Sequence, residues 1–73
     1  MFLVNAKFVG YKNNKRSVRA FIVSDSTPSP LPTTGENVDG MTADEIFSPF
    51  SIIYTTDAGK VFIANESGEF VEQ

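Results

Sequence analysis

Residues 51–73 read SIIYTTDAGKVFIANESGEFVEQ, and this stretch decides the fold class. Two β-rich segments flank Asp57-Ala58-Gly59, and a third follows Glu66-Ser67-Gly68. Each connection has three residues and ends in glycine, which suits a type I turn followed by a left-handed position. The stretch therefore predicts a three-stranded antiparallel meander. One face would hold Ile52, Tyr54, Phe62, Ala64 and Phe70, and the other Ile53, Val61, Ile63 and Val71.

The first 24 residues predict a β-hairpin. Residues 2–11 and 16–24 are rich in Phe, Val and Ile, and they flank Lys12-Asn13-Asn14-Lys15. Because asparagine tolerates positive φ, Asn13-Asn14 can form a two-residue turn, which sets a register with Val9 opposite Val18. Both faces of this hairpin are apolar: one carries Phe2, Val4, Ala6, Phe8, Phe21 and Val23, and the other Leu3, Val9, Tyr11, Val18, Ala20 and Ile22.

A long loop is predicted over residues 24–40, where SDSTPSPLPTTGENVDG contains three prolines and two glycines. Such a loop in a small domain usually has a functional or interface role. We expect Leu31, its one large apolar anchor, to pack against a sheet face. Residues 31–35 spell LPTTG, the pentapeptide that sortases cut, but no hydrophobic span and basic tail follow it. We therefore expect a structural turn, with Thr33 and Thr34 solvated.

One helical turn is predicted after this loop. Thr42 and Glu45 have the spacing of a capping box, and Met41 and Ile46 have that of a hydrophobic staple. Pro49 disfavours helix at the residue before it, so the helix cannot run far.

Together these segments predict an all-β fold in a single domain, residues 1–73. We expect a small antiparallel sandwich or barrel-like domain of about five strands. A chain this short buries only about 60% of the surface of its unfolded form. The absence of Cys and His excludes disulfides and zinc, which leaves self-association as the means of stabilisation.

Apolar residues on both faces of each predicted sheet also favour a homo-oligomer. The expected interface comprises Leu3, Val9, Tyr11, Val18, Ile22, Leu31, Ile53, Val61, Ile63 and Val71. The alternative is a monomeric β-domain whose second faces are covered by the long loop and the helical turn.

The charge is divided along the chain. Five cations and no acid lie in residues 1–20, whereas nine acids and Lys60 lie in residues 21–73, giving halves of +5 and −8. A nucleic-acid partner would require the basic strip to stay exposed and dominate the local field; with a sequence pI near 4.6 we expect none. The N-terminus has no signal-peptide pattern and no apolar run is long enough for a membrane helix, so we expect a protein that is not secreted and has no membrane partner.

Catalysis is not expected. Without His or Cys the commonest general base and the best nucleophile are missing. Adjacent Asp44 and Glu45 could serve an enzyme only with a strongly raised carboxylate pKa in an ordered pocket. We predict no enzyme activity, no cofactor and no metal site.

Residues 24–73 resemble a known group of proteins. DSTPSPLPTTGENVDGM followed by FSPFSIIYTTDAGKVFIANESGEFV resembles small proteins encoded among the structural genes of tailed bacteriophages and prophages. Gly59, Phe62, Gly68 and Phe70 hold the pattern, with Phe70 where Trp is commoner. The resemblance implies a non-enzymatic structural or assembly protein in a virion or the host cytoplasm, which self-associates and contacts other phage structural proteins.

A second hypothesis comes from the charge of residues 21–73. An acidic binding module could occupy the basic groove of a host protein such as a nuclease and inhibit it.

Overall fold

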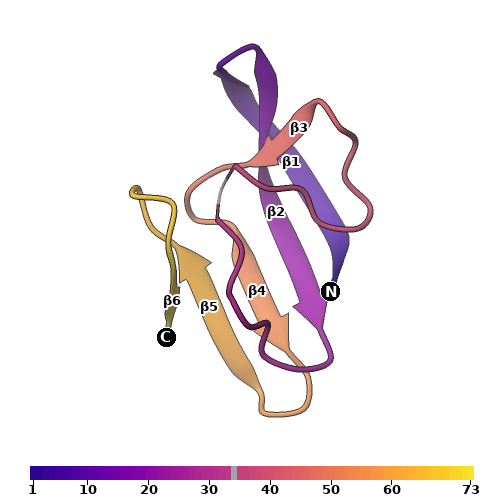
Figure 1. Cartoon of the computed structure of the whole chain (residues 1–73), viewed down its shortest axis with the longest axis vertical. Helices are drawn as coiled ribbons and strands as arrows, with labels where there is room; N and C mark the ends of the chain where they lie inside the picture. Colours follow the sequence, from indigo (N-terminus) through magenta and orange to yellow (C-terminus); the bar gives the residue numbers. More distant parts are fainter. Residues whose placement is uncertain (34) are drawn as a thin grey trace.

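The computed structural model describes residues 1–33 and 35–73. Six strands form one open sheet, and there is no helix in this part of the chain (Figure 1). The strands are β1 (Phe2–Lys12), β2 (Lys15–Ser24), β3 (Glu45–Phe47), β4 (Ile52–Thr55), β5 (Lys60–Ala64) and β6 (Phe70–Glu72). The all-β prediction is confirmed.

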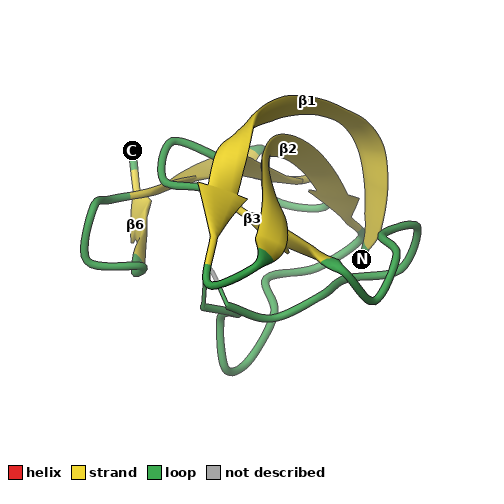
Figure 2. Ribbon diagram, turned by 90° about the horizontal axis from the view of Figure 1, so that it is seen from above, coloured by secondary structure: helices red, strands yellow, loops and turns green. Residues whose placement is uncertain are grey.

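The predicted N-terminal hairpin is β1–β2. Asn13 and Asn14 both have positive φ, 53° and 63°, as a type I′ turn requires. The predicted register holds next to the turn, where Lys12 pairs with Lys15. It is wrong beyond Gly10, because a bulge at Val9 pairs Phe8 with Val18 and a second irregularity at Val4 shifts the register again. Bulges bend the strand that contains them, and the hairpin curls strongly in Figure 2.

The sheet is mixed, which corrects the expected antiparallel sandwich or barrel. Its strand order is β1-β2-β4-β5-β6, and β3 also pairs with β2. Both β3 and β4 run parallel to β2, along successive parts of the same edge. Between them the buried Ser51 hydroxyl accepts a hydrogen bond from the Ala20 N–H at 3.0 Å and donates one to the Ser48 carbonyl at 2.7 Å. A side chain thus fills the gap in the backbone ladder.

The predicted helical turn near Thr42 is wrong. Half of the capping box forms, since the Thr42 N–H donates a hydrogen bond to Glu45 Oε1 at 3.0 Å. The Glu45 N–H also donates one to the Thr42 carbonyl at 3.0 Å, which closes a turn. The chain then becomes extended as β3, because the edge of β2 offers backbone partners from Arg16 to Val18.

The C-terminal meander β4–β5–β6 is antiparallel as predicted. Its second turn has the expected register, with Ala64 opposite Phe70. The first turn is one residue longer than predicted, because Thr55 rather than Thr56 pairs with Lys60. A one-residue shift exchanges the two faces of a strand. Ile53 therefore points into the core with Phe62, and Ile52 and Tyr54 point away from it.

The core lies between one sheet face and the loop that connects β2 to β3. Figure 2 shows this loop gathered on one side of the sheet. Leu31 packs against the core as expected, and the loop also contributes Val38, which is buried, and Met41. The core residues that the strands contribute are Ala20, Ile22, Phe47, Ile53, Phe62, Ala64 and Phe70. Thr33 is exposed as predicted, whereas the prediction for Thr34 lies outside the described residues.

Candidate interaction surface

The sheet face opposite the loop is apolar across five strands. Its rows follow the register: Phe21, Ile52, Ile63 and Val71 form one, and Phe2, Val23, Tyr54 and Val61 form another. These eight residues and Phe50, which lines hollows beside Phe21 and Ile52, are called the open face. It exists because the strands alternate between the core and this side with apolar residues at both.

Several large side chains of the open face are exposed. Phe50 is 57% exposed, Phe2 53%, Val71 47%, Phe21 40% and Tyr54 36%. The other four members are half-buried by their neighbours in the sheet. Large exposed apolar patches often mark interaction sites, so the open face is the candidate interaction surface.

Phe50 has an unusual backbone conformation. Ser48, Pro49, Phe50 and Ser51 form a turn closed by the Ser51 N–H on the Ser48 carbonyl at 3.3 Å. Pro49 suits the second place of a type II turn, but the third place requires positive φ and prefers glycine. Phe50 has a φ of 69° there, which costs about 1–2 kcal/mol in a residue with a Cβ. Its N–H holds this conformation by donating to the Ala64 carbonyl at 2.6 Å.

Charged groups lie beside Phe50. Lys7 and Arg19 are directly opposite each other in the hairpin and are exposed. Glu66 and Glu69 lie at the turn between β5 and β6. Glu66 lines a hollow with Phe50 and Arg19, whereas Glu69 lines one with Leu31 and Thr33 of the loop between β2 and β3. Arg19 and Glu66 line the same hollow beside Phe50, so a cation and an acid lie together at this end of the open face.

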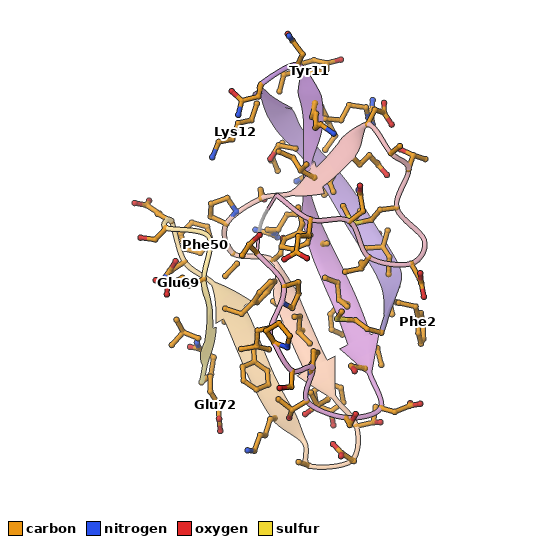
Figure 3. All side chains as sticks on the ribbon, in the orientation of Figure 1. Phe2, Tyr11, Lys12, Phe50, Glu69 and Glu72 are labelled. Atoms are coloured by element: carbon orange, nitrogen blue, oxygen red, sulfur yellow. The ribbon has the colours of Figure 1, made fainter. Side chains whose placement is uncertain are left out.

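The hairpin tip is a separate basic and aromatic cluster. Tyr11 is 73% exposed and meets Phe8 edge to face, with ring centroids 5.3 Å apart. The Arg16 guanidinium lies 4.9 Å from the Phe8 ring centroid, within range of a cation–π contact. Figure 3 shows Tyr11 and Lys12 at this tip, far from Phe50. Among the described residues the one salt bridge joins Lys60 to Glu72, at 3.9 Å, so none of the five N-terminal cations is paired.

Among the candidate acids, Asp44 has a lowered pKa. A hydrogen bond from the Thr42 hydroxyl, at 2.5 Å, is the main cause that lowers the pKa of Asp44, and Arg16 and Lys15 act in the same direction. A general acid at neutral pH needs the opposite shift. In residues 1–33 and 35–73, no three acidic side chains are placed to share a metal ion. Within the same ranges, no helix has the length and apolar character needed to cross a membrane.

The structure divides the predicted interface residues into three groups. Val61, Ile63 and Val71 lie on the open face. Val18, Ile22 and Ile53 are at most 2% exposed, so they belong to the core of the chain itself, against which Leu3 and Leu31 pack. Val9 and Tyr11 are exposed on the hairpin, away from the rows of the open face. The open face also contains Phe2, Phe21, Val23, Phe50, Ile52 and Tyr54, which the predicted interface did not include.

Comparison with protein-family models, curated proteins and solved structures gives no match for this chain.

Proposed function

We propose that this chain is a non-enzymatic structural or assembly protein that self-associates through its open face and docks on a larger particle. The observation that carries the proposal is the open face itself. Five large apolar side chains there are at least 36% exposed, while the loop between β2 and β3 covers the opposite face. Covering these side chains removes apolar surface from water, which drives association.

A second copy of the same chain offers an apolar face of the same extent. The two longer extents of the molecule are 35 and 23 Å, an outline of about 800 Å² that includes the hairpin tip. A standard stable protein interface buries about 800 Å² on each partner. A pair joined by the open face, which excludes the tip, would therefore form an interface smaller than this standard size.

The charges also suit a second copy. Two identical faces related by a two-fold axis along the strands place β1 and β2 of one chain over β5 and β6 of the other. That arrangement would bring Lys7 and Arg19 toward Glu66 of the partner, while Arg19 and Glu66 also line one hollow within each chain. Opposite charges at the rim favour this orientation over others.

The larger particle is proposed from the sequence. Residues 24–73 resemble small structural proteins of tailed bacteriophages and prophages, which favours a virion or its assembly intermediate in the host cytoplasm.

The two tyrosines provide a matched test of self-association. Tyr54 lies on the open face between Val23 and Val61, whereas Tyr11 lies at the hairpin tip. We expect the wild type to associate on sedimentation from micromolar to millimolar concentration. Tyr54→Glu should remain a monomer of 8.0 kDa, and Tyr11→Glu should behave as the wild type. Circular dichroism confirms that each variant is folded.

Two results would refute self-association through this face. One is a wild type that stays monomeric at every concentration, and the other is a Tyr54→Glu variant that associates as tightly as the wild type. Docking is tested separately, by detecting the chain in gradient-purified particles. A monomer recovered with one basic host enzyme instead of particle proteins would favour the acidic inhibitor.

A further inference from the structure

Phe50 combines two unfavourable features that fold stability does not explain. Its backbone has positive φ at a turn position that glycine occupies without strain. Its ring is also more than half exposed, so burial within the chain does not compensate for the strain. Strained residues persist where the surrounding structure enforces them, and they concentrate at functional sites.

Two hollows flank Phe50, and the first of them lies on the open face. The first has a volume of about 200 Å³ and is lined, besides Phe50, by Asn5, Lys7, Arg19, Ala20, Phe21 and Ile52. The second has about 310 Å³ and is lined by Val9, Arg19, Ser48, Pro49 and Glu66. Phe50 and Arg19 are common to both. An exposed aromatic ring thus stands directly beside a hollow on the same surface.

The first hollow suits an aromatic ring. Ala20, Phe21 and Ile52 provide its apolar lining. A cavity of about 150 Å³ is large enough to hold benzene. Lys7 and Arg19 also line it, and cations over an aromatic face attract the ring. The hollow therefore offers both apolar contact and positive charge to an incoming phenyl group.

We propose that Phe50 is the anchor of the self-association, and that the ring of each chain inserts into the 200 Å³ hollow of a second copy. This inference rests on the proposed function and names the residue and the site that carry it. A two-fold axis requires each patch to be self-complementary. A projecting ring next to a hollow that accepts a ring satisfies this requirement, because both insertions form at once.

Phe50→Gly gives the sharpest test, because it should keep or raise the stability of the isolated chain while it weakens the affinity of self-association. Glycine adopts the backbone of the turn without strain, so the isolated chain should unfold at the same or a higher urea concentration. Loss of the ring removes the anchor, and an interface anchor is worth at least about 2 kcal/mol, so the dimer dissociation constant should rise about 30-fold or more. Stability is measured in the Tyr54→Glu background, so that association does not contribute to it.

Phe50→Asn is the second variant, since asparagine also tolerates positive φ. It should weaken association as the glycine variant does. Tyr11→Ser is the control for the loss of an exposed aromatic side chain, and it should leave the dissociation constant unchanged.

Each result has a distinct meaning. If Phe50→Gly associates as the wild type while Tyr54→Glu does not, the open face is the interface but Phe50 is not its anchor. If both Phe50 variants unfold at lower urea concentration, the ring stabilises the fold and the inference is overturned. If the wild type itself never associates, the proposed function fails and the inference fails with it.

Discussion

Replacing Ser51 by alanine tests how the sheet passes from β3 to β4. Ser51 is fully buried, and its hydroxyl is the acceptor for the Ala20 N–H on the edge of β2 away from β1, at the point between its pairing with β3 and its pairing with β4. Ser51→Ala leaves that N–H buried without an acceptor, which costs about 1–3 kcal/mol. The Ser48 carbonyl loses the hydrogen bond from the Ser51 hydroxyl but still accepts one from the Ser51 N–H at 3.3 Å, so the substitution costs less at this group. We expect a loss of about 2 kcal/mol, from a total of about 4–11 kcal/mol for a chain of this length.

The assay is equilibrium unfolding in urea, with matched protein concentrations and the Tyr54→Glu background. The midpoint should fall without a change in slope, because the surface exposed on unfolding stays the same. In a thermal scan the loss corresponds to a Tm lower by about 8–16 °C. Ser67→Ala is the control: Ser67 is exposed, and it is its backbone N–H that donates to Asn65 Oδ1. If Ser51→Ala shifts the midpoint no more than Ser67→Ala, the hydroxyl does not complete the ladder.

Two further predictions concern the segment between β2 and β3. Gly40→Ala should lower the free energy of unfolding by about 1–3 kcal/mol, because its φ is 99° and a Cβ there would lie 3.1 Å from the Leu3 Cβ. Gly35→Ala is the control, because a Cβ at Gly35 meets nothing within 4 Å. It should be nearly neutral in the same urea titration. Asp44→Asn should destabilise the chain more at neutral pH than well below pH about 3.9, the ordinary aspartate pKa. Because the hydrogen bond from Thr42 lowers the folded-state pKa of Asp44, its stabilising effect is present above the ordinary pKa and is lost as the pH falls through the lowered value. A difference between wild type and variant that is equal at both pH values would contradict this.

The hairpin turn was predictable because its chemistry is local. Two asparagines between apolar runs favour positive φ at both positions, and both adopt it. The bulges at Val9 and Val4 were not predictable from local sequence. A bulge bends its strand, and the bend that is needed depends on how the strand packs around the rest of the core. Val18 therefore faces Phe8 rather than Val9.

The turn between β4 and β5 shows how one residue changes the expected site. Asp57-Ala58-Gly59 looked complete as a three-residue turn, but Thr56 joins it, and the side chains of β4 exchange faces. Ile53 thereby moved from the expected interface to the core. Ile52 and Tyr54 moved the other way, onto the open face.

The parallel pairing of β2 could not be read from local sequence. Its partners β3 and β4 lie beyond the long loop, and strand pairing at such separation depends on which edges remain free in the folded chain. Thr42 and Glu45 have the spacing of a helix start, yet the free edge of β2 beside Arg16 to Val18 draws Glu45–Phe47 into a strand. Tertiary pairing here overrides a local capping signal.

Phe50 left only a weak signal in the sequence. Ser-Pro-Phe-Ser contains the proline of a turn, but an aromatic residue at the place that needs positive φ is not what turn chemistry leads one to expect. The structure is needed to show that the turn has this shape and that the ring lies beside a hollow.

The bulges of β1 and the shortness of β6 limit how the proposed self-association could continue through the edges of the sheet. A long regular strand at the side of a sheet exposes a row of backbone groups that can pair with another chain, and this leads to fibres. In β1 two irregularities interrupt that row, and the Leu3 N–H is already occupied by the Asp39 carbonyl at 2.8 Å. At the other side β6 offers only three residues. If copies associate through the open face as proposed, these two edges disfavour the extension of one chain's sheet by another, which favours a closed pair over an open-ended filament.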